Sequence, residues 1–385
     1  MKNKKIPRQV IILGFVSLFT DVASEMLYPV TPIFLTAVLG SSMAVVGIIE
    51  GLAEITAGLL KGYFGNLSDR IGKRAIFVVL GYGLSALSKP LPGIIPTVGV
   101  VAGSRVSDRV GKGIRTAPRD ALLASNSNKN NTGAIFGIHR AMDTLGAAIG
   151  PLAAIALLFF YPDNYSLIFI VAFVPSSIAI GFTFLVKDKS PAFIKKRKLN
   201  YFSFWKEAPS QYKRMIILIT IFSLVNSSDV FLILKSMDIS KSSSLAIFGY
   251  VFFNIVYAAA SYPLGRVADK YSKKNVFVGG LFVFSAVYLG FAFNNNYLIA
   301  LFLFALYGIY SAATEGIAKA WVSDLIPDEK RGSGIGLLTM LSSLAIMVGS
   351  FLAGFLWDMF GPMIPFLISS IVSLIVGIIF LFIKN

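Results

Sequence analysis

Four acidic residues stand in the first two apolar segments of the chain, where charge is costly. Asp21 and Glu25 are four residues apart, as are Glu50 and Glu54, so each pair occupies one face of a helix. Such a carboxyl can exchange protons, because burial favours its neutral form and a nearby arginine favours its charged form. The pattern indicates proton chemistry. We expect Asp21 and Glu54 to be the first carriers, followed by Glu25.

Residues 105–122, RVSDRVGKGIRTAPRDAL, supply mainly the opposite charge. All but one step in this series is three or four residues, which predicts one charged stripe along a helix: Arg105, Asp108, Arg109, Lys112, Arg115 and Arg119. We expect acids of the first two spans to meet these bases. Arg105 and Arg109 would then hold a carboxylate's charge or an anionic substrate group. The alternative is that such pairs only fix helix registry and add little stability.

Other polar residues fall inside apolar segments. His139, Arg140 and Asp143 lie about one turn apart on the predicted fifth span, and Asn226, Asp229 and Glu315 are the corresponding candidates in the second half of the chain. We predict substrate contact for Asp229 beside Asn226. Lys235 and Lys319 are expected to reach the membrane surface with their ammonium groups. A group of tyrosines could line the substrate cavity: Tyr250, Tyr257 and Tyr310.

The elements that must position these residues are membrane helices. The chain has 385 residues, of which 56% are hydrophobic and 14% charged, and its mean hydropathy is +0.75. Apolar runs of membrane-spanning length recur throughout. The sequence predicts an all-α polytopic protein with twelve spans at about 10–39, 44–64, 75–92, 97–117, 133–160, 166–186, 213–236, 245–264, 275–293, 297–321, 333–358 and 363–383. The predicted halves are 1–186 and 213–385, joined by a basic cytoplasmic linker at 187–212.

Whether the fourth segment crosses the membrane can be decided from the side on which the later loops must lie. Residues 105–122 are too charged to be selected by hydropathy, yet placing them wholly in a loop would put the basic segment 187–214 outside the cell. That would contradict the positive-inside rule, so the stretch is predicted to be at least partly transmembrane.

The net charge of +16 follows the same rule. Basic clusters alternate with connections that carry no Lys or Arg, which predicts an inner-membrane protein with both termini in the cytoplasm and does not indicate nucleic-acid binding. The chain has no cysteine and one histidine, so we expect no metal and no cofactor. No nucleotide-binding loop, HExxH motif or Ser-His-acid set indicates an enzyme.

The two halves repeat one another. GNLSDRIGKR at 65–74 corresponds to GRVADKYSKK at 265–274, VSLFTD at 16–21 is similar to FSLVNS at 222–227, and GAAIGP at 146–151 parallels LAIMVGS near Gly349. Transporters built from two related halves place their substrate site between them near the midplane.

These motifs resemble the major facilitator superfamily. Residues 65–74 are similar to its signature loop, YPVTP at 28–32 and GAAIGP to elements of its drug–proton antiporter branch; the fourth span departs from the family pattern, with Arg109 where a Gly is expected. The resemblance implies an antiporter motif of Gly146, Gly150 and Pro151, and a cytoplasmic gate of Gly65, Asp69, Arg70, Gly72, Arg74, Arg115, Arg119, Gly265 and Asp269. Gly65 would permit close helix contact and Gly72 a tight turn, while Asp69 would cap a helix or pair with Arg115 or Arg119.

We therefore expect a secondary transporter that exports a small molecule in exchange for protons by alternating access. The expected partners are that substrate, protons and membrane lipid, and the expected state is a monomer. Three alternatives stay open: a lipid flippase, a divalent-cation exporter, and a membrane sensor that transports nothing.

Overall fold

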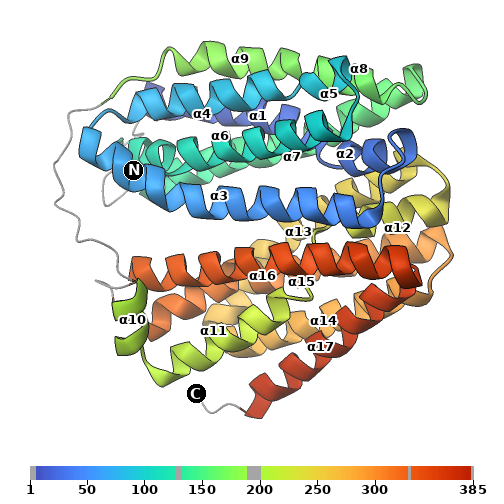
Figure 1. The fold of residues 1–385 in the computed structure, drawn as a ribbon. Coiled ribbons are helices and arrows are strands. Elements are labelled where there is room, and N and C mark those ends of the chain that lie inside the picture. Colours follow the sequence, from blue (N-terminus) through green and yellow to red (C-terminus); the bar gives the residue numbers. More distant parts are fainter. Residues whose placement is uncertain (1–5, 127–131, 189–200, 328–330, 383–385) are drawn as a thin grey trace. The chain divides into compact units, whose positions relative to one another are not determined.

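The computed structural model describes residues 6–126, 132–188, 201–327 and 331–382, apart from the side chains of residues 69, 70, 132–134, 137, 201–203, 331 and 332. The described chain consists of helices joined by short turns, and it forms no strand (Figure 1). The predicted all-α class is confirmed.

The first six predicted spans correspond to ten helical elements, because three of the spans are interrupted. These elements are α1 (Arg8–Leu27), α2 (Val30–Ile33), the π-helix η1 (Phe34–Val38), α3 (Met43–Ile71), α4 (Arg74–Ser88), α5 (Leu91–Ile94), α6 (Val98–Ser125), α7 (Thr132–Phe160), α8 (Tyr165–Val171) and α9 (Phe173–Thr183).

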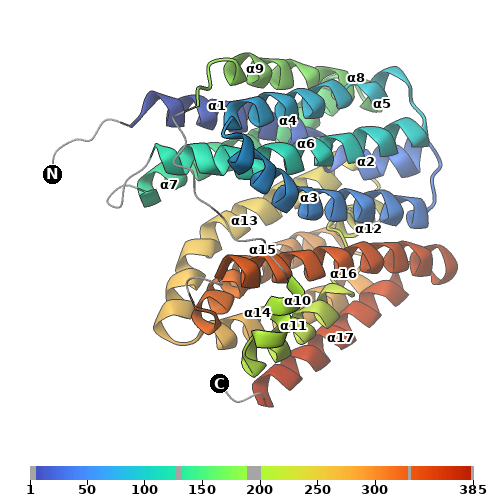
Figure 2. The same ribbon diagram turned by 60° about the vertical axis from the view of Figure 1, so that its left-hand side comes forward.

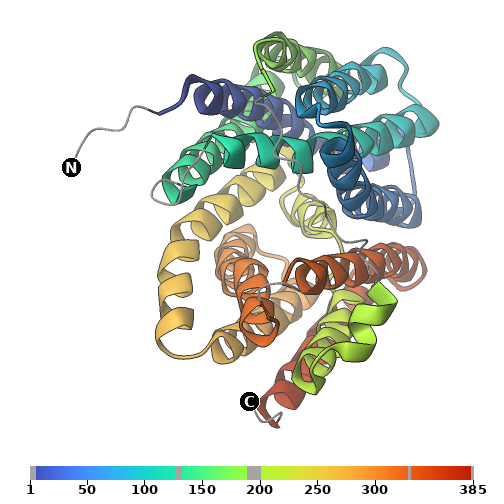
Figure 3. The same ribbon diagram turned by 90° about the vertical axis from the view of Figure 1, so that its left-hand side faces the viewer.

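The second six spans are more regular. They follow a short helix α10 (Tyr201–Glu207) and comprise α11 (Ser210–Ser223) with α12 (Val230–Ser240), then α13 (Ser243–Lys270), α14 (Lys273–Phe293), α15 (Tyr297–Leu325), α16 (Arg331–Phe360) and α17 (Met363–Phe382). Figure 3 shows α13 curving along its length, with Pro263 inside the helix.

Proline explains the interruption of span three. Pro90 and Pro92 have no backbone N–H, so the carbonyls four residues earlier, those of Ala86 and Ser88, lose their helical donors. The helix breaks at Lys89 and resumes as α5. Span seven breaks without proline, at the polar sequence NSSD (226–229), whose short side chains favour turns over helix.

The charged fourth span is one helix, α6, from Val98 to Ser125. Ten helices of the described chain are long and apolar enough to cross a membrane, and α6 and the broken pair α11–α12 are not among them. These two complete a twelve-span architecture. Gly111 lets α6 approach α4 closely, since a Cβ there would lie 2.4 Å from the carbonyl oxygen of Gly81. The prediction that residues 105–122 begin as a helix within the bundle is confirmed.

The chain divides into two compact units, described separately below. Unit 1 comprises residues 1–40 and 56–196, and unit 2 comprises residues 41–55 and 197–385. Residues 41–55 begin α3, a span that we had placed in the N-terminal half. They group with unit 2 because Gly47, Gly51 and Gly354 remove the side chains where α3 meets α16: a Cβ on Gly47 would lie 2.2 Å from the carbonyl oxygen of Ser350.

In unit 1, α1 lies beside α7 and α4 beside α6 (Figure 2). A hydrophobic core forms between them from Leu13, Val16, Val78, Tyr82 and Leu123, each at most 2% exposed. This apolar packing fixes the helices that carry the ionisable residues.

Candidate functional site

Asp21 and Asp143 come together where α1 packs on α7. The glycines of GAAIGP make this contact possible: a Cβ on Gly146 would lie 2.9 Å from the Cβ of Asp21, and one on Gly150 would lie 2.5 Å from the carbonyl oxygen of Val22. Asp143 lies one turn before Gly146 on α7, and its charge acts on Asp21. The small residues predicted from the antiporter resemblance therefore hold two carboxyls at one helix contact. Pro151 lies inside α7 directly after them.

Two bases of α6 complete this group. Lys112 and Arg119 are the cations that act most strongly on Asp21, and Lys112 also interacts with Glu25. A guanidinium nitrogen of Arg119 donates to the Ser17 hydroxyl of α1 at 3.2 Å and another to Asp120 at 2.9 Å. Acids of span one thus meet bases of span four within unit 1. Lys112 and Arg119 are two of the bases involved.

His139 joins the same group from α7. Its Nδ1 lies 3.4 Å from an Asp143 carboxylate oxygen, and the histidine is 4% exposed. Within the described chain, the second ring nitrogen of His139 and the second carboxylate oxygen of Asp143 are buried without a hydrogen bond. Arg140, its sequence neighbour, is exposed. The interior therefore presents unsatisfied proton-accepting and proton-donating atoms beside Asp143.

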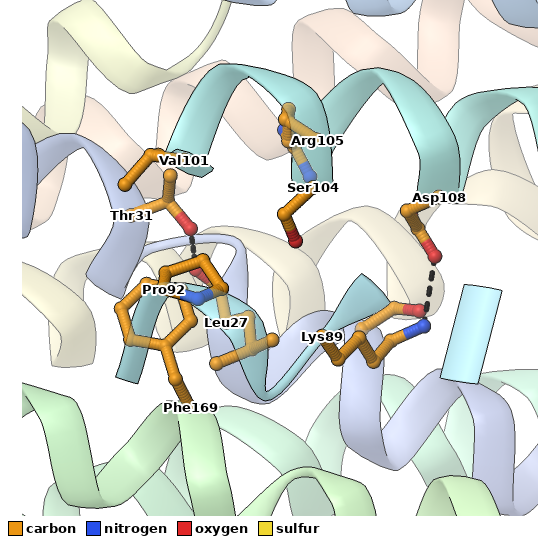
Figure 4. Close-up of a pocket in the computed structure, with 10 residues that line it drawn as sticks. Leu27, Thr31, Lys89, Pro92, Val101, Ser104, Arg105, Asp108 and Phe169 are labelled. Atoms are coloured by element: carbon orange, nitrogen blue, oxygen red, sulfur yellow. Dashed lines mark hydrogen bonds and ion pairs between the residues drawn. The ribbon is translucent and has the colours of Figure 1, made fainter. Parts of the chain in front are cut away.

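A second ionic contact joins span three to span four. The ammonium of Lys89 donates to Asp108 Oδ1 at 2.7 Å and to the carbonyl oxygen of Ser85 at 3.2 Å (Figure 4). The two side chains are 3% and 11% exposed. Our sequence analysis missed Lys89. Its position beside Pro90 at the end of an apolar run is typical of a lysine that reaches the membrane surface, and only the break at Lys89 turns it inward.

Arg105 and Arg109 lie on α6, before Lys112 in the chain. The Arg105 guanidinium stacks over the ring of Tyr28, 5.0 Å from its centre, and the residue is 8% exposed. The Nε of Arg109 is buried, and within the described chain it makes no hydrogen bond. The charge of Arg109 acts on Asp108 and Lys112. Arg105 thus lines the same cavity as the Lys89–Asp108 pair, and the charge of Arg109 acts on that pair.

Arg115, a predicted gate residue, is buried between α6 and α4. Its guanidinium donates to the Ser85 hydroxyl and to the carbonyl oxygen of Gly81, and it lies 4.4 Å from the centre of the Tyr82 ring. The side chains of Asp69 and Arg70 lie outside the described part of the chain. Arg74 begins α4, and its N–H donates to the Asp188 carboxylate at 2.8 Å.

The glycines of the signature loop act as expected. Gly65 faces α6, where a Cβ would lie 2.9 Å from that of Ala117, and Gly72 ends α3 with φ +72°, which favours glycine. The copy in unit 2 differs: nothing lies within 4 Å of a Cβ built on Gly265, and Asp269 is 3.7 Å from Lys273.

Unit 2 gathers tyrosines around its carboxylates. The Tyr307 hydroxyl donates to Asp229 at 2.6 Å, and Tyr257 donates to Glu315 at 3.0 Å. Tyr307 also packs against further rings: Phe253, Phe284, Tyr288 and Tyr310. The side-chain oxygen of Asn226 is buried, and within the described chain it has no hydrogen bond. Of the predicted cavity tyrosines, Tyr250 and Tyr310 are buried in this unit.

Three further predicted residues are placed by unit 2. Glu54 belongs to the part of α3 that packs there, and its carboxylate accepts from the Ser343 hydroxyl at 3.2 Å. Lys319 is exposed, but Lys235 is only 5% exposed, so the expectation that Lys235 reaches the membrane surface is wrong. Its ammonium stays inside because it lies 3.9 Å from Asp238, one turn further along α12.

Comparison with known proteins agrees with this architecture. The family model of the Major Facilitator Superfamily matches residues 13–249 and 215–385. The chain belongs to the major facilitator superfamily. It is 36% identical to an uncharacterised MFS-type transporter of Methanocaldococcus jannaschii, over 99% of this chain and 96% of that protein. This membership makes the chain a multi-pass membrane transporter.

Two further similarities are more distant. The multi-drug resistance efflux pump PmrA of Streptococcus pneumoniae is 30% identical over 114 residues, covering 29% of this chain and 28% of the pump. The crystal structure of the nucleoside transporter NupG superposes with a TM-score of 0.82 at 13% identity, covering 97% of this chain and 98% of that one. At that identity the structural similarity shows the fold alone.

Proposed function

We propose that this transporter exports a small molecule in exchange for protons, and that Asp21 with Asp143 forms its proton site. The observation that carries the proposal is the packing of these two carboxyls at the glycine contact of α1 and α7. Two carboxylates cannot share a partly buried site cheaply while both are charged, so uptake of one proton relieves their repulsion. The partial match to a multidrug efflux pump supports the direction of transport.

The surrounding basic side chains can change how tightly Asp21 and Asp143 hold the proton. Lys112 and Arg119 on α6 favour the charged carboxylates, whereas repulsion between Asp21 and Asp143 favours protonation. A movement of α6 relative to α1 and α7 would therefore change how tightly the proton is held. Alternating access supplies such movements, because it reshapes the surroundings of each half during every cycle.

The test begins with a thermal-shift screen of drugs, metabolites, cations and lipids on purified protein at two pH values. Each compound that raises the melting temperature is then added to inside-out vesicles that hold an acid interior, with a pH-sensitive dye inside. Proton-coupled export predicts proton release from vesicles with the wild-type protein and none with Asp21→Asn. Export without proton movement in wild-type vesicles would overturn the proposal.

Arg140→Gln provides a matched control. Arg140 lies on the same helix as Asp143 but is exposed, so neutralising it should leave proton release unchanged. If Arg140→Gln and Asp21→Asn reduced proton release equally, the loss would reflect general charge and not the carboxyl pair.

A further inference from the structure

Unit 1 contains a small cavity that the proposed proton site does not include. It is lined by hydroxyls, by the Lys89–Asp108 pair and by apolar side chains (Figure 4): Ser24, Leu27, Thr31, Lys89, Pro92, Val101, Ser104, Arg105, Asp108 and Phe169. The volume of the cavity is about 20 Å³. One water molecule requires ~10–15 Å³ on the same measure.

The prolines of span three create this cavity. Pro92 leaves the carbonyl of Ser88 without a helical donor, and the Ser104 hydroxyl of α6 takes that place at 2.6 Å. The break also turns Lys89 toward Asp108. Hydroxyls and charged groups therefore line the cavity beside the point where α4 ends.

The lining groups suit a water molecule. The Lys89 ammonium has three N–H groups and uses two of them on Asp108 and Ser85, which leaves one donor. The hydroxyls of Ser104 and Thr31 both donate to backbone carbonyls, so each offers its lone pairs to the cavity. A buried water needs two to four such partners, and this mixture of donor and acceptors supplies them.

The cavity extends from the outer end of unit 1 toward Asp21. Thr31, Pro92 and Phe169 lie near the ends of their spans, at the end of unit 1 that carries the loops 95–97 and 161–164, predicted to face outward. Val101 and Asp108 are separated by about 10 Å along α6 at 1.5 Å per residue. At the inner end, Ser24 is one turn from Asp21 on α1, and the charge of Asp21 acts on Lys89.

We infer that this cavity is a hydrated chamber through which protons from the outer side reach Asp21. Asp21 does not itself line the chamber, so a hydronium there leaves its water beside Ser24 and its proton crosses one helical turn to the Asp21 carboxylate. The Lys89–Asp108 pair keeps its charges and orients that water. The chamber's role in proton entry rests on the proposed function, whereas its hydration and its access from outside do not.

The absence of cysteine permits a direct test. Ser104→Cys places one thiol in the chamber, and Ser176→Cys places one at another buried position, on α9 and outside the chamber. Right-side-out vesicles are treated with Ag⁺, an ion that passes through water-sized passages, then denatured and labelled with a fluorescent maleimide. We expect Ag⁺ to abolish labelling of Ser104→Cys and to leave Ser176→Cys labelled.

Equal protection of the two thiols, or protection of Ser104→Cys only in inside-out vesicles, would overturn the inference. Thiols at Thr31 and Ser24 repeat the measurement at the two ends of the chamber, so a folding defect in one variant does not decide the result. Adding Lys89→Met with Asp108→Leu to Ser104→Cys should restore labelling, since an apolar pair no longer holds water. Unchanged protection would refute the role of the ion pair.

This result is independent of the proposed proton site. Asp21→Asn should leave Ag⁺ access to Ser104→Cys unaltered, because it changes the destination of the proton and not the chamber. Access without proton-coupled export would refute only the proposed function, and export without access would refute only the chamber.

Discussion

The two units bury different kinds of side chain. Unit 1 buries charge: among its described residues, five acidic or basic side chains are at most 8% exposed, namely Lys89, Arg105, Asp108, Arg115 and His139. Unit 2 buries aromatic rings around few charges, and its central tyrosines, Tyr288, Tyr307 and Tyr310, are at most 4% exposed. The comparison shows that related halves of one family fold differ in what they bury, one mainly charged side chains and the other mainly aromatic rings.

The difference follows from how each unit satisfies its polar groups. In unit 1 most buried cations have a counter-ion, a backbone carbonyl or a ring, as Lys89 and Arg115 do. In unit 2 the break in span seven is satisfied by neutral hydroxyls: Ser350 accepts from the N–H of Ser228, and Ser369 donates to the carbonyl of Val225. These hydroxyls bind the backbone of the break, and the one carboxylate within it, Asp229, accepts from the Tyr307 hydroxyl.

The strongest test of this comparison breaks the ion pair of unit 1. Asp108→Leu leaves the Lys89 ammonium buried without its counter-ion, which should cost about 3–5 kcal/mol of stability. Lys89→Met combined with Asp108→Leu removes both charges and should recover most of that loss. Chemical unfolding in detergent measures both. Equal losses in the single and double variants would show that the pair contributes shape and not charge.

The matching test in unit 2 removes one hydroxyl. Tyr307→Phe deletes the 2.6 Å bond to Asp229, and a hydrogen bond to a charged group contributes about 1.5–3 kcal/mol. Tyr288→Phe is the control, because the buried Tyr288 hydroxyl makes no hydrogen bond in the described chain; its melting temperature should match the wild type. A larger loss in the control would mean that the Tyr288 hydroxyl, and not the bond from Tyr307 to Asp229, determines stability here.

Helix approach in unit 1 provides a third test. Gly150→Ala forces a methyl group against the backbone of Val22 and Met26, and such overpacking costs about 1–3 kcal/mol. Gly181→Ala on α9 meets no atom within 4 Å and should gain up to about 1 kcal/mol of helix stability. The two melting temperatures should therefore move in opposite directions. A neutral Gly150→Ala would contradict the close contact of α1 and α7.

The smallest effects should be alike in the two units. Asp188 accepts from the N–H groups that begin α4, and Asp358 does so for those that begin α3, at 2.8–3.0 Å. Replacing either by Ala should cost about 0.5–2 kcal/mol, as for other helix caps. Similar shifts in melting temperature would show that the two units differ only in their buried interiors. A much larger loss for one cap would show that they also differ at their helix ends.

The sequence predicted the architecture well because the membrane imposes few solutions. The alternation of inner and outer loops and the spacing of the charged residues identified α6. Its mean hydropathy alone did not, because Arg105, Arg109 and Lys112 lie within it. The roles of Gly65 and Gly72 were also predictable, since close approach and a positive φ both require glycine.

The pairing of the charges was not predictable from the sequence. Spacing shows which residues share a helix face, but the packing of neighbouring helices determines which faces meet. The sequence did not show that Lys112 and Arg119 act on Asp21, or that Lys89 turns inward at the break before Pro90. Likewise, Lys235 stays buried because Asp238 lies close to it.

The account is tested most directly by separating proton coupling from substrate movement. In proteoliposomes, Asp21→Asn should abolish export of a transported compound driven by a pH gradient. Exchange of the same compound at equal pH on both sides should continue, because the aromatic contacts of unit 2 are intact. Gradient-driven export at the wild-type rate in Asp21→Asn would contradict the central claim that unit 1 carries the proton.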